Sequence, residues 1–171
     1  MTAMKYYVSN DGRYLGGWDA NPPPGAIEVP SAPDDARQLW LGDSWGEVPS
    51  APVTSLDIDI ERDRRIDAGV EFQGLLFQSR ATDRENIAGA AQLGFMAVVA
   101  GAEANDLRWS NPDQDFAWIA SDNSLVPMDA QTVVAFGKTA AERKQALIFA
   151  ARQLKDMEPI PADYTDDKWW P

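Results

Sequence analysis

One long stretch decides the fold of the larger part of the chain. Residues 129–157 read DAQTVVAFGKTAAERKQALIFAARQLKDM. Apolar side chains recur there every three or four residues, which is the spacing of one face of an α-helix, at Val133, Phe136, Ala140, Leu147, Ala150, Leu154 and Met157. Asp129 precedes the pattern and is a residue type that caps helices. The stretch therefore predicts a long amphipathic helix.

One turn of this helix is apolar on nearly every side. Residues 146–151 read ALIFAA, and Ile148 and Phe149 lie off the apolar stripe. A turn of this kind is buried from several sides, either by the fold or by another subunit. Ile148 and Phe149 are therefore candidate partner-binding residues.

A second helix is predicted over about 83–103. Thr82-Asp83-Arg84-Glu85 has the pattern of a capping box, in which the hydroxyl and the carboxylate each satisfy a backbone amide. Residues 87–102 carry no charge, and Gln92 is their one polar side chain. We expect a buried helix whose small Gly and Ala residues let neighbours approach closely. The run is shorter than the roughly 20 residues of a bilayer span, so membrane insertion is not expected.

Shorter elements lie between and before these helices. A helix is predicted from Thr54 or Ser55 to about Ala68, with acidic residues early and arginines late, as the helix dipole favours. A tight hairpin is predicted over 69–77 around Gln73-Gly74, and a second over 107–119 around Asn111-Pro112-Asp113.

The first 52 residues predict a small β module rich in Pro, Gly and Trp. Strands are expected over 4–9, 13–18 and 26–29, followed by a small hairpin over 38–48. Trp40 and Trp45 are candidate core or contact residues, because so small a module buries little area on its own. Residues 49–52 read as a proline-rich linker.

The expected fold class is α+β, with the β module followed by about three helices and two β-hairpins. The expected divisions are a module at 1–52, an α+β domain at 53–158 and an acidic, extended tail at 159–171. The tail ends in Trp169-Trp170-Pro171, and exposed Trp residues are costly. These two tryptophans either pack on their own chain or dock on a partner.

The composition excludes much chemistry. The chain has 171 residues with no Cys and no His, so it holds no thiol nucleophile, imidazole base or Cys/His zinc site. Its net charge of −12 argues against nucleic-acid binding. Gly137-Lys138-Thr139 lacks the upstream Gly of a phosphate loop, and Asp57-Asp59-Glu61 lacks the Gly and closing Glu of a calcium loop. We expect no catalytic residue, cofactor or metal.

A family resemblance rests on the order of several short motifs. They are Arg64-Arg65 through Gly74, Thr82-Asp83-Arg84-Glu85-Asn86, Asp106-Leu107-Arg108-Trp109, the strand Phe116–Ile119, and Met128-Asp129-Ala130-Gln131. Over roughly residues 58–158 this order resembles a domain-of-unknown-function family of tailed bacteriophages, whose members are usually encoded beside tail-fibre genes. The N-terminal stretch is similar to N-terminal modules of phage tail and tail-fibre-assembly proteins. The family implies no catalytic residues and leaves out the Trp-Trp-Pro tail.

The resemblance implies a virion component rather than an enzyme. The leading hypothesis is a structural protein of the tail tip, baseplate or fibre apparatus, assembled in the host cytoplasm. Its partners would be other tail or tail-fibre proteins and further copies of itself, as a trimer or hexamer. Two alternatives stay open: a tail-fibre assembly chaperone that leaves before maturation, and a carbohydrate-directed binding module or hydrolase.

Overall fold

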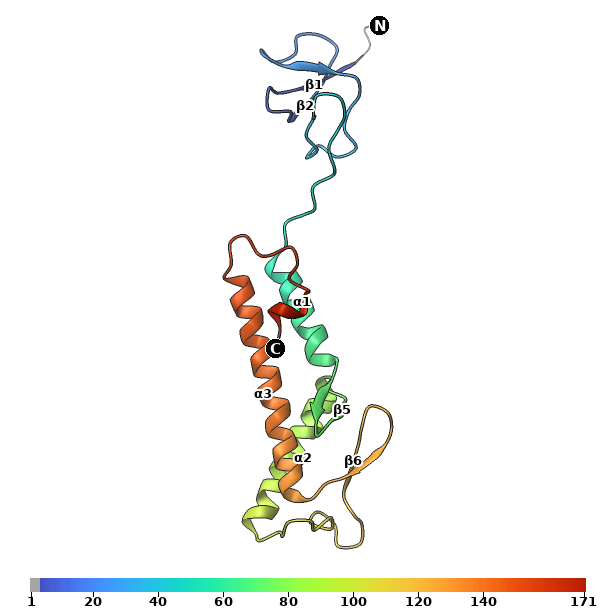
Figure 1. Ribbon diagram of the computed structural model, residues 1–171, viewed down its shortest axis with the longest axis vertical. Coiled ribbons are helices and arrows are strands. Elements are labelled where there is room, and N and C mark those ends of the chain that lie inside the picture. Colours follow the sequence, from blue (N-terminus) through green and yellow to red (C-terminus); the bar gives the residue numbers. More distant parts are fainter. Residues whose placement is uncertain (1–3) are drawn as a thin grey trace. The chain divides into compact units, whose positions relative to one another are not determined.

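The computed structural model describes residues 4–171 and has the predicted α+β class (Figure 1). A three-stranded sheet is followed by three helices with two β-hairpins. The chain forms two compact units, Met1–Ala51 and Pro52–Pro171, and the division between them falls within the proline-rich segment 49–52.

The first unit is built on a small antiparallel sheet. It contains β1 (Lys5–Val8), β2 (Tyr14–Trp18) and β3 (Ile27–Val29), in the order β2-β1-β3. Gly12 has φ of 80° in the turn before β2, a conformation that glycine adopts without steric cost. The small hairpin expected over 38–48 is reduced to a single bridge between Trp40 and Trp45.

The second unit is organised along α3 (Ala130–Lys155), to which both other helices are antiparallel (Figure 1). Near one end of α3, Lys155 forms an ion pair with Asp59 of α1 (Ser55–Asp67). Near the other end, Ala130 lies against Gly94 of α2 (Ala81–Val99). Each half of α3 is therefore covered by a different helix.

Two separate apolar clusters follow from this arrangement. The first surrounds Phe136 on the N-terminal half of α3, with Val70, Phe77, Ile87, Ala120, Met128 and Val133. The second lies on the C-terminal half and joins α1, α3 and the chain terminus through Ile58, Ile66, Leu147, Ala151, Leu154 and Trp170.

One of the two hairpins is where the sequence predicts it. Strands β4 (Val70–Phe72) and β5 (Leu75–Phe77) pair around Gln73 and Gly74. Both turn residues have positive φ, 51° and 77°, as a tight hairpin turn requires.

The second hairpin differs from the prediction. Strand β6 (Ala117–Ile119) pairs with β7 (Leu125–Pro127), which follows it, instead of with residues 107–109. The turn lies at 121–124, where Asn123 has φ of 66° and the Asp122 carboxylate accepts the Ser124 amide at 2.9 Å. Trp109 is outside the sheet and donates its indole N–H to the Met128 carbonyl at 3.0 Å.

The helix caps were predicted correctly for α1 and α3 but not for α2. The Thr54 hydroxyl accepts the Asp57 amide at 3.4 Å, and the Asp57 carboxylate accepts the Thr54 amide at 2.8 Å in return. The Asp129 carboxylate accepts the Thr132 amide at 2.8 Å. Helix α2 begins two residues earlier than expected, because the Asp83 carboxylate accepts the Arg80 amide at 2.9 Å, and it ends at Val99, four residues earlier than expected. Thr82 therefore lies inside the first turn.

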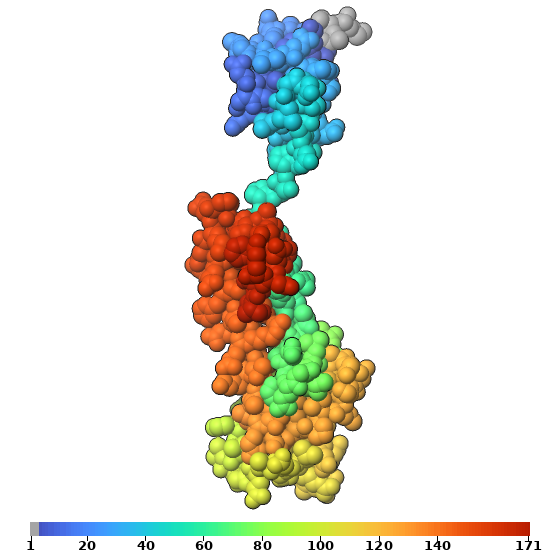
Figure 2. All heavy atoms as spheres, in the orientation of Figure 1, coloured from blue at the N-terminus to red at the C-terminus, as the bar shows by residue number. Residues whose placement is uncertain are grey.

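The C-terminal tail is folded rather than extended, which corrects the prediction. After α3 the chain forms turns and a short 3₁₀ helix, η1 (Asp167–Trp169), and its residues lie against the second unit (Figure 2). Trp170 is 7% exposed and donates its indole N–H to the Tyr164 carbonyl at 2.7 Å. The tail is therefore part of the second unit.

A buried carboxylate of α1 holds the arginine that connects this helix to the tail. Glu61 is 6% exposed and accepts hydrogen bonds from Arg64 and Arg65, each at 2.6 Å. Arg65 also donates to the Thr165 carbonyl at 2.7 Å and to Asp167 at 2.9 Å. The hydrogen bonds from Arg64 hold the pKa of Glu61 below its ordinary value of 4.5, although burial opposes this shift.

Replacing this carboxylate has a pH-dependent effect. We expect Glu61→Gln to lower the free energy of unfolding by about 1–3 kcal/mol at pH 7. Because the folded-state pKa is depressed, the stabilisation is complete above pH 4.5 and is lost as the pH falls through the folded pKa. Urea titrations at pH 7 and pH 3 check this: the gap between wild type and Glu61→Gln should shrink on acidification. An equal gap at both pH values would contradict it.

Candidate protein-interaction surface

Helix α2 exposes most of its apolar surface, which corrects the prediction that it is buried. Ile87 and Gly94 are its buried residues. Four large side chains are more than half exposed: Leu93 (60%), Phe95 (58%), Met96 (59%) and Val99 (73%). Among residues 4–171, α3 is the only helix that packs along α2. One broad side of α2 is therefore left uncovered.

The side of α2 that faces α3 shows the predicted close approach. A Cβ atom added at Gly94 would lie 3.0 Å from the Ala130 carbonyl oxygen. A Cβ atom added at Gly137 of α3 would lie 2.4 Å from the Cβ of Ala91. These contacts leave no room for a larger residue, so both glycines are explained by packing within the chain.

Gly89, on the uncovered side, has no such explanation. A Cβ atom added there would meet nothing within 4 Å. Glycine inside a helix costs about 0.5–1 kcal/mol relative to alanine. Nothing in the described part of the chain uses the space that this glycine leaves open.

The uncovered side has the spacing of a helix-packing seam. Ala88, Gln92, Phe95 and Val99 follow one another at intervals of four, three and four residues, and Gly89 and Met96 flank them. No charged residue lies between Glu85 and Glu103. The N-terminal part of the seam carries small residues and the C-terminal part carries large ones.

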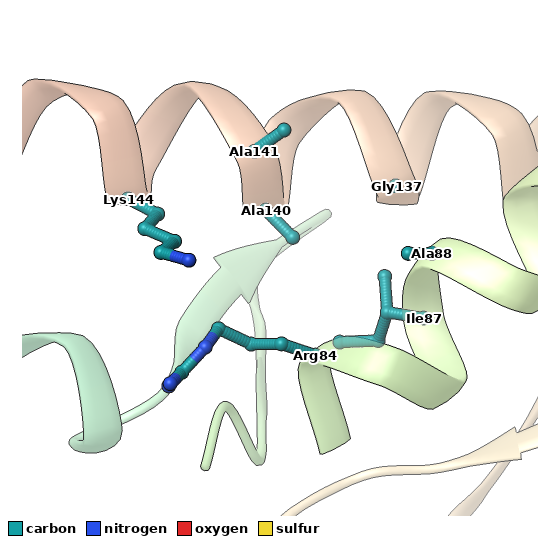
Figure 3. Close-up of a pocket in the computed structure, with 7 residues that line it drawn as sticks. All are labelled: Arg84, Ile87, Ala88, Gly137, Ala140, Ala141 and Lys144. Atoms are coloured by element: carbon teal, nitrogen blue, oxygen red, sulfur yellow. The ribbon is translucent and has the colours of Figure 1, made fainter. Parts of the chain in front are cut away.

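A pocket of about 200 Å³ lies beside this seam, between α2 and α3 (Figure 3). Its lining is apolar except at one end, where Arg84 and Lys144 lie. Arg84 already donates to the Asp67 carboxylate at 2.7 Å. The apolar lining comes from Ile87, Ala88, Gly137, Ala140 and Ala141. No carboxylate or hydroxyl group lines the pocket, and its apolar wall suits an apolar side chain.

The sequence profile of the domain-of-unknown-function family DUF4376 matches residues 52–168. The chain belongs to the DUF4376 family. The match covers the whole second unit except its last three residues and reaches into the tail, which the resemblance left out. No curated protein matches the chain significantly. No solved structure matches it significantly either.

Of the predicted partner-binding residues, two lie on the surface of the DUF4376 domain. Ile148 is 42% exposed and Phe149 is 59% exposed. Ile148 lies about one turn beyond Lys144 on α3. Phe149 points about 100° away from Ile148 around the helix axis. The apolar turn 146–151 is therefore covered on one side only, through Leu147 and Ala151.

The two C-terminal tryptophans belong to the DUF4376 domain's own packing. Trp170 is in the second cluster, and the Arg65 guanidinium lies 5.2 Å from its ring centroid. Trp169 is half-buried and donates its indole N–H to the Asp163 carboxylate at 3.1 Å. Of the two interpretations of the tail, the structure shows packing on its own chain.

Trp40 and Trp45 contact each other within the first unit. Their ring centroids are 5.3 Å apart in an edge-to-face arrangement, and both rings are half-buried. Trp45 also packs against Tyr14 and donates its indole N–H to the Ser31 carbonyl at 3.2 Å. These contacts supply part of the small module's core.

Sequence reasoning missed the exposed residues of α2, and one signal could have found them. A helix that is apolar on all sides needs cover on all sides. The DUF4376 domain has only two other helices, and α1 lies along the opposite half of α3. A second missed patch is the outer face of the β6–β7 hairpin, where Ile119 (56% exposed) and Leu125 (70% exposed) are cross-strand neighbours.

A cluster of metal-ligating side chains and a membrane-spanning helix are both absent from residues 4–171. Within 4–171, no three Asp or Glu side chains lie close enough together to hold a metal ion. None of the helices described there is both long enough and apolar enough to span a bilayer. The apolar surface of α2 is therefore the most prominent candidate site of the DUF4376 domain.

Proposed function

We propose that this protein is a non-enzymatic structural component of a bacteriophage tail, in the tail tip, baseplate or fibre apparatus. It acts through protein–protein contacts. The observation that carries the proposal is the uncovered face of α2, which has no charge after Glu85 and has four large apolar side chains more than half exposed. Contiguous apolar surface of this kind marks a site of protein association.

Two further features support this proposal. The sequence lacks Cys and His, the residues that most often supply nucleophiles and general bases. The motif order over 58–158 resembles proteins encoded beside phage tail-fibre genes. That resemblance gives the expected partners, which are other tail or tail-fibre proteins.

Permanent assembly is favoured over a transient chaperone role. Obligate interfaces are more apolar than transient ones. The exposed seam of α2, the outer face of β6–β7 and the α3 side chains Ile148 and Phe149 are all apolar. These surfaces would be covered in an assembled tail and would remain costly to expose if the protein were released.

Mass spectrometry of purified, washed particles tests the proposal. We expect the protein to be present at a fixed copy number that matches the tail symmetry, three or six per particle. Its absence from particles, together with loss of fibres when its gene is deleted, would instead identify an assembly chaperone. A control sample with an abundant host protein of similar charge reports how complete the washing is.

A further inference from the structure

We propose that the uncovered face of α2 pairs with the same face of a second copy of this chain, antiparallel and centred on Gln92. This inference rests on the proposed function and refines it, because it names one of the partners and the surface that binds it. Of the two copy numbers expected there, a twofold pair fits six and not three. The face offered is one side of a 19-residue helix, about 28 Å long.

The distribution of side-chain size on this face makes it complementary to itself. In an antiparallel pair centred on Gln92, residues at equal distances before and after position 92 meet across the interface. Phe95 then faces the Ala88–Gly89 region of the second copy, and Met96 faces Ala88 and Gly89 from the other flank. Large residues meet small ones on both sides of Gln92, as close helix packing requires, while at the two ends Val99 meets Glu85. A parallel pair would place large against large and small against small.

This arrangement explains why residue 89 is a glycine. An added Cβ there meets nothing within its own chain, yet glycine weakens the helix. In the pair, the missing side chain lets the second copy's Met96 approach the backbone. The small residue is therefore required by the second copy and not by the chain's own fold.

The charge pattern identifies α2 as the place where two copies can approach with the least repulsion. The chain has a net charge of −12, so two copies repel each other over most of their surfaces. From Asn86 to Ala102 α2 and the loop after it carry no charge, and Gln92 at the centre is neutral. A side-chain amide is both donor and acceptor, so two Gln92 side chains can bond each other across a twofold axis.

The pocket between α2 and α3 lies on the flank where the second copy's Phe95 would arrive. Ala88 lines the pocket and also belongs to the seam (Figure 3). Around the helix axis, Ala88 and Phe95 lie within about 20° of each other, on the side nearer to α3. The pocket of about 200 Å³ is apolar next to Ala88, so it can receive an aromatic ring.

Charge complementation at position 92 tests whether the face pairs with itself. The full chain should dimerise in sedimentation experiments, with a dissociation constant on the order of 10 µM for so small an interface. Gln92→Glu and Gln92→Lys should each weaken dimerisation at least tenfold, because like charges meet at the axis. An equimolar mixture of the two should restore it. Gln153→Glu, the same change at an exposed position on α3, is the matched control and should leave dimerisation unchanged.

Cysteine cross-linking tests the direction of pairing, and the natural absence of Cys makes the result clean. Positions 85 and 99 lie symmetrically about 92. In the antiparallel pair, Glu85→Cys mixed with Val99→Cys should give a disulfide-linked dimer under mild oxidation. Either variant alone should not, because its two thiols would be about 21 Å apart along the axis.

Several outcomes would overturn the inference. They are a wild-type chain that stays monomeric at 200 µM, a charge mixture that does not regain dimerisation, or cross-linking within single variants instead of the mixture. None of these results bears on whether the protein is found in particles. Failure of the pairing and failure of the proposed function can therefore be told apart.

Discussion

Replacing Trp170 with alanine is expected to lower the free energy of unfolding of the DUF4376 domain by about 3–5 kcal/mol. Trp170 is 7% exposed and fills the second cluster, between Ile58 and Ile66 of α1 and Leu147 of α3. The substitution also removes the indole N–H bond to the Tyr164 carbonyl and the contact with the Arg65 guanidinium. The C-terminal residues are therefore a structural part of this core.

Trp169→Ala is the matched control, because it removes the same ring from the neighbouring position. Trp169 also packs against the second cluster but is only half-buried, and its indole N–H bonds a tail carboxylate. We expect a loss of about 1 kcal/mol. Urea denaturation followed by circular dichroism measures both variants. Equal losses of unfolding free energy in the two variants would contradict the assignment of Trp170, rather than Trp169, to the core.

Phe136→Ala is expected to lower the free energy of unfolding by a similar amount, about 3–5 kcal/mol, through the other cluster. Phe136 has no exposed surface and is the centre of an aromatic group. Its ring centroid lies 4.7 Å from that of Phe77, 5.3 Å from Phe72 and 5.5 Å from Trp118. Truncation leaves a cavity where β4–β5, β6–β7 and α3 meet.

Phe149→Ala is the control on the same helix. Phe149 is 59% exposed, so the same truncation should change the free energy of unfolding by less than about 0.5 kcal/mol. Thermal or urea unfolding of the Phe136→Ala and Phe149→Ala variants measures the two losses. A loss of several kcal/mol for Phe149→Ala would mean that Phe149 is covered in solution. Dilution would then show whether a second copy covers it.

Local signals in the sequence account for most of the fold. Thr54 and Asp129 cap α1 and α3 as predicted, since a cap depends on residues within one turn of it. Gln73-Gly74 fixes the first hairpin for the same reason. The pairing of the second hairpin was predicted wrongly, because two turn signals, at 111–113 and at 121–124, compete for the same strand. Only tertiary contacts, such as that of Trp109 with Met128, decide between them.

The candidate site was harder to predict, because exposure is a property of the whole arrangement. The run 87–102 correctly indicates an apolar helix with close neighbours, and Gly94 and Gly137 show that closeness. The sequence cannot say how many sides of that helix its own chain covers. For the same reason Trp170, a residue type enriched in interfaces, proved to be part of the chain's own core.

The placement of two cores on one helix has a consequence for cooperativity. Helix α3 contributes Phe136 to one cluster and Leu147 to the other, and each cluster has its own second helix. Proteins open in cooperative units that follow such contacts, so the two halves need not open together. We therefore expect the half built on α1 and the C-terminus to open more independently of the aromatic half than a single core would allow, with the contact between Arg84 and Asp67 as one link between them. In that case the half that bears α2 would keep its proposed pairing face intact.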